Sequence, residues 1–234
     1  MSTENRVALI TGAAGTLGRA AAAAFAGIGI KRILLDRSKA ALGAAYGADA
    51  DDQLLAVADL GNPQEIAGAV AEAMRRFGRI DILCNIAGGF RMGEKVHETS
   101  AETWHLMIEL NAGSVITMAH AVVPHMLAAG RGKIINIAAM GGLAGGAEMG
   151  AYAASKSAVI RLTESMGREL REHGINVNCV MPSIIDTPPN RAAMPGADPA
   201  RWVAPAALAD VILFLASDQA RAIHGAAIPV VGLS

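Results

Sequence analysis

The sequence predicts a doubly wound α/β domain built on a parallel sheet of about seven strands. Short apolar runs of strand length alternate with longer segments of helical period along the whole chain. A length of 234 residues suits one domain with one sizeable core. Glycine and alanine make up about a third of the residues and aromatics only 3%. Such small residues let the layers of an α/β domain approach closely.

Seven apolar runs are predicted to form the buried strands of this sheet. In chain order they cover residues 7–10, 33–35, 54–58, 80–84, 133–138, 175–180 and 227–231. The strand–helix alternation predicts right-handed crossovers, so that helices cover both faces of the sheet.

Five longer segments have helical period and are predicted as helices. They cover residues 17–26, 63–77, 101–129, 152–172 and 206–216. The second begins at Asn62-Pro63, with proline in the first turn, and the third is expected to break near Asn111. Residues 181–205 hold six of the nine prolines. We predict that this irregular stretch is a lid or binding loop.

The composition excludes several classes of protein. Apolar residues make up 53% of the chain and the net charge is −1, which argues against a disordered protein and an electrostatic nucleic-acid binder. Mean hydropathy is +0.36, but the longest uncharged runs contain His and Pro, so no membrane span is expected. Without a signal-peptide core after Arg6, the expected location is cytoplasmic. Cys84 and Cys179 are interpreted as reduced core residues.

A glycine-rich turn follows the first strand and precedes the first helix. It comprises Gly12, Gly15, Thr16, Leu17 and Gly18. A strand–turn–helix of this kind points backbone N–H groups and a helix dipole at a diphosphate. The simpler interpretation is a tight turn without a ligand.

Asp36 ends the second strand, eighteen residues after the last glycine of this turn. A carboxylate there accepts the ribose hydroxyls of NAD and repels the 2′-phosphate of NADP. Arg37 is opposing evidence, because a guanidinium binds phosphate. We predict that the carboxylate dominates and that NAD is preferred, with NADP the less favoured cofactor. The alternative is a solvated aspartate.

Tyr152 and Lys156 lie four residues apart on a predicted helix, so they share one face. A nearby ammonium favours the phenolate and is expected to lower the tyrosine pKa from about 10. This pair is typical of a general acid. Considered alone, it is more often a surface pair.

Further motifs occur in register with these two. They are Asp59-Leu60 after the third strand, Asn85-Ile86-Ala87-Gly88 after the fourth, Asn111 in the long helix, and the segment from Pro182 through Ile185 to Thr187. With the glycine-rich turn and the Tyr-x-x-x-Lys motif, the chain resembles the short-chain dehydrogenase/reductase family over nearly its whole length.

The resemblance implies an NAD(P)-dependent oxidoreductase with Tyr152 as general acid/base. By resemblance, Lys156 also binds the nicotinamide ribose, Asp59 contacts the adenine, and Asn111 holds a water that passes protons. The side chain of Asn111 also has a simpler interpretation, in which it satisfies its own backbone at a helix kink. The family commonly assembles as tetramers through the helices at 111–129 and 152–172, so a homotetramer or homodimer is expected. None of the six histidines has metal-site spacing, and no metal is expected.

Three departures from the family pattern lie in the cofactor-binding motifs, and the first bears on how closely the backbone approaches the diphosphate. Thr16 replaces the middle glycine of the turn, and its hydroxyl either donates to phosphate or caps the helix. Ile86 replaces the second Asn of Asn-Asn-Ala-Gly, and Ser183 replaces the glycine after Pro182. We expect little effect from the last two.

The fourth departure concerns catalysis, because Ala139 occupies the position of the family's catalytic serine. Losing one such donor typically slows carbonyl chemistry by about a hundredfold to a thousandfold. Three explanations remain open: the substrate needs no donor, another group supplies it, or the chain binds NAD without strong catalysis, as a regulatory or structural protein.

The segment 186–202 favours the first explanation. Asp186-Thr187-Pro188-Pro189-Asn190-Arg191, followed by Met194-Pro195 and Trp202, resembles the corresponding loop of dihydropteridine reductases. By resemblance, those enzymes also lack the serine and reduce an electron-poor quinonoid substrate. The predicted reaction is hydride transfer between a nicotinamide cofactor and a small carbonyl, quinonoid or imine-like compound.

Overall fold

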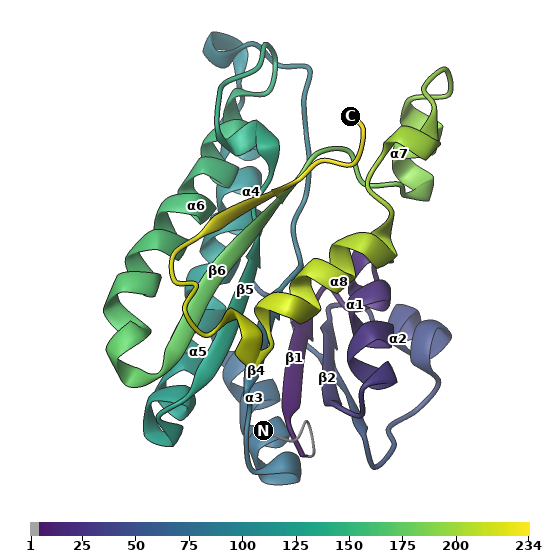
Figure 1. Cartoon of the computed structure of the whole chain (residues 1–234). Helices are drawn as coiled ribbons and strands as arrows, with labels where there is room; N and C mark the ends of the chain where they lie inside the picture. Colours follow the sequence, from purple (N-terminus) through teal and green to yellow (C-terminus); the bar gives the residue numbers. More distant parts are fainter. Residues whose placement is uncertain (1–4) are drawn as a thin grey trace.

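Seven parallel strands form one sheet in the computed structural model of the chain, which describes residues 5–234 (Figure 1). The sheet order is β3-β2-β1-β4-β5-β6-β7, and every neighbouring pair is parallel. The strands are β1 (Val7–Thr11), β2 (Lys31–Asp36), β3 (Gln53–Val57), β4 (Ile82–Asn85), β5 (Gly132–Ile137), β6 (Ile175–Pro182) and β7 (Ala227–Val230). This arrangement confirms the predicted doubly wound α/β fold.

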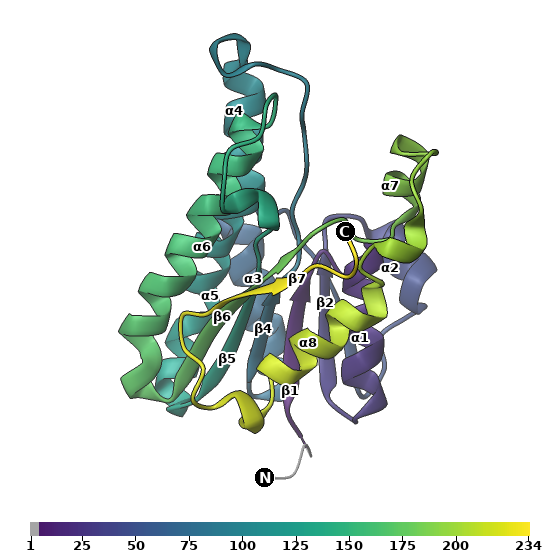
Figure 2. The same cartoon turned by 45° about the horizontal axis from the view of Figure 1, so that its top comes forward.

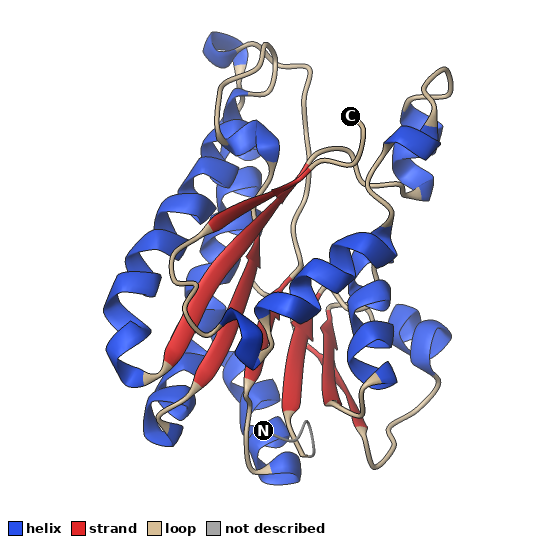
Figure 3. Cartoon of the chain, in the orientation of Figure 1, coloured by secondary structure: helices blue, strands red, loops and turns tan. Residues whose placement is uncertain are grey.

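Helices cover both faces of the sheet (Figure 3). One face carries α1 (Thr16–Gly27), α2 (Lys39–Tyr46) and α8 (Pro205–Leu215). The other carries α3 (Pro63–Phe77), α4 (Ala101–Ile108), α5 (Ser114–Ala129) and α6 (Gly150–Leu170). The central strands β1, β4, β5 and β6 are buried along their whole length. Burial on both faces accounts for their continuous apolar sequences.

Small residues set the close packing of the first helix layer. Ala21 and Ala22 of α1 are fully buried in a cluster that also holds Phe25 and, from α8, Leu208 and Ile212. Because alanine side chains are short, α1 lies directly against α8 and the sheet. The alanine-rich composition is therefore a packing requirement of this layer.

The chain reverses its direction of winding between β1 and β4, where the sheet order changes sense. Helices on either side of such a point leave a crevice at the carboxyl ends of the strands, where α/β domains bind ligands. The glycine-rich turn after β1 and the Asn85-to-Gly88 loop after β4 both start at this crevice. Figure 2 shows α7 (Pro188–Ala193) beyond the same ends of the strands.

The predicted helix over 101–129 is interrupted by a π-helical turn, Glu109–Gly113, which contains Asn111. The expected break is confirmed. By length and composition, Ala101–Ala129 is the one helical stretch in residues 5–234 that is able to cross a bilayer. This is weak evidence, because core helices of soluble proteins pass the same test, and α5 buries Met118, Val122 and Met126 against the sheet.

Two short helices were not predicted. Residues 39–46 form α2, whose start is capped by Ser38: its Oγ accepts the N–H of Ala41 at 3.1 Å. The stretch 181–205 is not irregular throughout, because β6 extends to Pro182 and residues 188–193 form α7. Thr187 Oγ1 accepts the N–H of Asn190 at 3.3 Å, and the two prolines that follow suit a first helical turn.

Both cysteines are buried and unbridged, as predicted. Burial raises the pKa of the Cys84 thiol, and it raises that of Cys179 to about 11. Both therefore stay protonated and unreactive at neutral pH.

Candidate active site

The glycine-rich turn is packed tightly against the loop after β4. Gly12 has a φ of +63°, a left-handed conformation that glycine adopts without strain. A Cβ added to Gly12 would lie 2.9 Å from Ala87 Cα, and one added to Gly18 would lie 2.2 Å from the Gly12 carbonyl oxygen. Neither position accommodates a side chain, so both glycines are needed for this turn.

The amino end of α1 presents backbone N–H groups to the crevice. Gly15 is the N-cap, and Thr16 is the first helical residue and is exposed. The alternative that the Thr16 hydroxyl caps the helix is therefore wrong. Within residues 5–234, the N–H groups of Thr16, Leu17 and Gly18 donate to no acceptor. They leave the positive end of the helix dipole available to an anion.

Asp36 lies beside this turn at the end of β2. Its Oδ2 accepts the N–H of Ala14 at 3.1 Å, and its Oδ1 accepts the N–H of Ser38 at 3.2 Å. A carboxylate has about four acceptor positions, so both oxygens retain capacity for hydroxyl donors. Arg37 is exposed on the adjoining turn.

Asp59 and Leu60 have mainly local contacts in this structure. Asp59 is exposed, and its Oδ1 accepts the N–H of Gly61 at 2.8 Å. Its own N–H donates to Glu65 Oε2 at 2.9 Å, which ties the loop to the start of α3. Leu60 packs against the core.

The side chain of Asn111 joins three segments of the crevice. Its Nδ2 donates to the carbonyl oxygen of Gly89 at 3.1 Å and to Ser155 Oγ at 3.0 Å, and its Oδ1 accepts the N–H of Gly89 at 3.0 Å. The Ser155 hydroxyl in turn donates to the Tyr152 carbonyl oxygen at 2.7 Å. Asn111 thus bonds to neighbouring segments, and the alternative that it satisfies its own backbone is wrong.

Gly88 brings Asn111 and Lys156 together. A Cβ added to Gly88 would lie 2.7 Å from Asn111 Oδ1 and 3.3 Å from Lys156 Nζ. The Lys156 ammonium is buried and donates to the carbonyl oxygen of Ile137, at the end of β5, at 2.8 Å. Burial lowers the pKa of Lys156 to about 8.

Tyr152 is half-buried on the same helix and packs edge-on against Phe90, with 4.8 Å between ring centroids. Burial raises its pKa to about 12. The expected lowering by Lys156 is therefore wrong for this structure, because desolvation of the phenolate dominates and the ammonium is bonded to Ile137. The Tyr152 phenol is therefore protonated at neutral pH.

Asn85 begins a polar network through the core that the sequence did not indicate. Its Nδ2 donates to Asn136 Oδ1 at 2.9 Å, and Asn136 Nδ2 donates to Thr163 Oγ1 at 2.9 Å. Within the described chain, the buried Oδ1 of Asn85 has no partner. The network links β4 and β5 to α6, which carries Tyr152 and Lys156. The available signal was Asn136, a polar residue inside the apolar run 133–138.

Ala139 is buried at the start of a 3-10 turn, Met140–Gly142, that follows β5. A Cβ added to Gly142 would lie 2.8 Å from the backbone carbonyl carbon of Lys156. The turn is therefore pressed against α6 beside the Tyr-Lys pair, and Ala139 at its start carries only a methyl group.

The segment after β6 is held by bonds among its own residues. Pro182 is buried at the end of the strand, Ile185 forms a bridge with Val203, and the Ile185 carbonyl oxygen accepts Asn190 Nδ2 at 2.8 Å. Arg191 pairs with Asp186 at 2.6 Å and holds the pKa of that carboxyl below its usual value. These bonds order the predicted binding loop.

Comparison with known proteins identifies the family. Residues 6–197 match the family described as short chain dehydrogenase. The chain belongs to this family. Its relatives include the 2-(R)-hydroxypropyl-CoM dehydrogenase of Xanthobacter autotrophicus, 33% identical over 244 residues (97% of this chain, 98% of the relative). The 3-oxoacyl-(acyl-carrier-protein) reductase FabG of Thermotoga maritima is 35% identical over 246 residues (99% and 98%).

Solved structures agree with this short-chain dehydrogenase in fold. Carveol dehydrogenase from Mycobacterium avium, solved in complex with NAD, superposes with a TM-score of 0.87 at 28% identity, covering 97% of this chain and 96% of that one. The relatives are dehydrogenases and reductases, which supports an oxidoreductase role. Among residues 5–234, no three His, Cys, Asp or Glu side chains are grouped to hold a metal ion.

Proposed function

We propose that this short-chain dehydrogenase transfers a hydride between NAD(H) and a small carbonyl, quinonoid or imine-like compound, with Tyr152 as the proton donor. The observation that carries the proposal is that Asn111 and Lys156 meet beside Gly88 at the carboxyl end of the sheet, with Tyr152 one helical turn from Lys156 and packed on Phe90. Asn111 is bonded to Gly89 and, through Ser155, to the Tyr152 backbone, and Lys156 is bonded to the Ile137 carbonyl oxygen.

The crevice fits a dinucleotide. The N–H groups of Thr16, Leu17 and Gly18 are free to bind a diphosphate. Gly12 and Gly18 let the turn close against Ala87 and the Gly12 carbonyl, which holds these N–H groups in place. Asp36 retains acceptor capacity for the ribose hydroxyls, and its charge favours NAD over NADP. The cofactor supplies or accepts the hydride when bound.

The chain's own residues handle the proton. With a pKa of about 12, Tyr152 is fully protonated at neutral pH and is suited to donate to an oxygen that gains negative charge. The Lys156 ammonium lies on the same helix face four residues on and supplies positive charge to the site. Asn111 positions the Gly89 backbone and, through Ser155, the first turns of α6.

Ala139 favours a substrate that needs little stabilisation of charge on oxygen. A methyl group donates no hydrogen bond, so an unactivated ketone would lack one of the donors that its reduction requires. An electron-poor quinonoid pterin or quinone accepts hydride more readily. The likeness of the 186–202 loop to dihydropteridine reductases points to the same substrate class.

The test is NADH consumption with two acceptor classes. Wild type is expected to reduce a quinonoid pterin or quinone well and a simple ketone poorly. Ala139→Ser should raise ketone reduction by up to about a hundredfold and leave the activated acceptor nearly unchanged. Tyr152→Phe should abolish ketone reduction in both backgrounds.

Two results would contradict this proposal. If NADH binds but neither acceptor class is reduced, even in Ala139→Ser, the chain is a catalytically weak NAD-binding regulatory or structural protein. If wild type reduces ketones quickly and Ala139→Ser changes nothing, another group supplies the hydrogen bond. In that case Ala139 does not select the substrate.

A further inference from the structure

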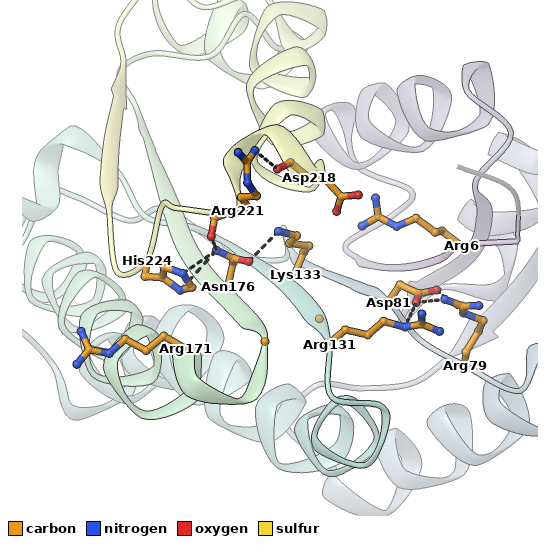
Figure 4. A pocket seen from close by; sticks show the side chains of 12 residues that line it. Arg6, Arg79, Asp81, Arg131, Lys133, Arg171, Asn176, Asp218, Arg221 and His224 are labelled. Atoms are coloured by element: carbon orange, nitrogen blue, oxygen red, sulfur yellow. Dashed lines mark hydrogen bonds and ion pairs between the residues drawn. The ribbon is translucent and has the colours of Figure 1, made fainter. Parts of the chain in front are cut away.

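A cavity of about 500 Å³ lies at the amino ends of the strands, opposite the proposed active site (Figure 4). Six cations line it, and they come from five separate segments of the sequence. They are Arg6, Arg79, Arg131, Lys133, Arg171 and Arg221. Two carboxylates, Asp81 and Asp218, line it as well, so its formal charge is +4 in a chain of net charge −1.

Asp81 already has its full set of donors. The carboxylate is almost fully buried and accepts Arg79 Nε at 2.7 Å and the N–H of Val7 at 2.9 Å. Arg131 Nε approaches the same carboxylate at 3.6 Å, and the Arg131 side chain is 51% exposed. One carboxylate therefore faces two guanidinium groups, and positive charge remains on this wall of the cavity.

Arg6 and Lys133 form the second wall of the cavity. Their positive charges are neutralised less by carboxylates than those of the first wall. Arg6 donates to the carbonyl oxygen of Ala216 at 2.7 Å, and buried Lys133 donates to Asn176 Oδ1 at 2.7 Å. Within the described chain, neither cation has a carboxylate oxygen within 4.0 Å, although the charge of Asp218 acts on both. Burial lowers the pKa of Lys133. Burial takes these two cations out of water. An anion bound between them would replace the lost hydration with charge–charge interactions.

The segment that carries Asp218 and Arg221 is fixed in place. Asn176 Nδ2 donates to the carbonyl oxygens of Arg221 at 3.0 Å and Ile223 at 2.9 Å, which ties the segment to the start of β6. The same side chain orients the Lys133 ammonium through its Oδ1. The cavity is thus held by strand ends and a bonded loop, and its charges are preorganised.

We propose that this cavity binds a compact polyanion whose charge is carried by phosphoryl or carboxylate groups. Its volume is within the range of small-molecule sites. The excess positive charge favours a ligand with more than one negative group. Arginine guanidinium groups form bidentate hydrogen bonds with both phosphoryl and carboxylate groups. None of the lining residues is Phe, Tyr or Trp, which argues against a ligand that stacks a base. The position at the amino ends separates this site from the crevice that the proposed function uses.

The test is calorimetric titration of the full chain with sodium pyrophosphate and, separately, with sodium citrate, at an ionic strength held constant with sodium chloride. Wild type should bind at least one of them. The double variant R131Q/R221Q, which changes two exposed arginines, should bind it at least about tenfold more weakly. R75Q is the matched control, because Arg75 is exposed on α3 and pairs with Glu72 outside the cavity. It should bind like wild type.

Binding of pyrophosphate alone would assign the site to phosphoryl groups, and binding of citrate alone to carboxylates; both support the proposal if R131Q/R221Q weakens the binding. The glycine-rich turn is a second place for pyrophosphate, but the double variant leaves that turn intact. Equal affinity in wild type and R131Q/R221Q would therefore overturn the proposal, as would heats no larger than those of sodium chloride. NADH is absent from the titration, so its outcome is independent of the proposed oxidoreductase activity.

Discussion

At the scale of single residues, Asp36 is expected to decide cofactor preference. It lies beside the free N–H groups of α1, where its charge opposes a 2′-phosphate. Fluorescence titration should show tighter binding of NADH than of NADPH, and Asp36→Ala should shift the preference towards NADPH by about tenfold or more. Arg37→Ala serves as the control and should retain the preference for NADH. Tighter binding of NADPH by wild type would contradict the assignment.

Lys156 should give activity a characteristic pH dependence. Its pKa of about 8 means that the ammonium loses its proton as the pH rises through 8, whereas Tyr152 stays protonated to about 12. The value of kcat/KM for NADH, which reports groups of the free enzyme, should be level below pH 8 and fall above it. Lys156→Arg keeps its charge, so its lower activity should not show this fall. A level wild-type profile up to pH 10 would exclude the role of Lys156.

At the scale of elements, the junction of β1 and α1 depends on Gly18. Gly18→Ala would place a methyl group 2.2 Å from the Gly12 carbonyl oxygen and 2.8 Å from Ala13 Cα, both backbone atoms. We expect a loss of about 1–3 kcal/mol in unfolding free energy, measured in urea, together with loss of NADH binding.

Gly27→Ala, at the other end of the same helix, provides the control for Gly18→Ala. No atom lies within 4 Å of an added Cβ there, so this variant should gain about 0.5–1 kcal/mol and bind NADH normally. If Gly18→Ala is as stable as wild type, the turn is not held closed by glycine.

At the scale of the whole molecule, α5, one of the two helices expected to join copies of the chain, carries exposed apolar side chains, as does α4 before it. Trp104, Ile116 and Leu127 are 44%, 56% and 41% exposed on these helices. Light scattering should give a dimer or tetramer of the 24.0 kDa chain, and Ile116→Glu should reduce the assembly. Ile28→Glu, at an exposed apolar position after α1, should leave it unchanged. A wild-type mass near 24 kDa would contradict this prediction.

The sequence by itself determined the sheet and the positions of the motifs. All seven strands were located from their apolar runs to within a few residues. The runs of β1, β4, β5 and β6 are continuous because these strands are buried on both faces. Gly12, Gly18 and Tyr152 were also found from local pattern, since turns and helix faces are set by nearby residues. The short helix α2 was missed, because its eight residues show little amphipathic period.

Only the tertiary structure decided the environments of the charged and polar groups. The pKa of Tyr152 depends on burial, and the partners of Asn111 come from residues 89 and 155, which no local pattern brings together. The basic cavity is a further case, because its cations lie between positions 6 and 221 of the sequence. They meet because parallel strands align all their amino ends at one edge of the sheet. Such proximity follows from topology and long-range packing rather than from sequence separation.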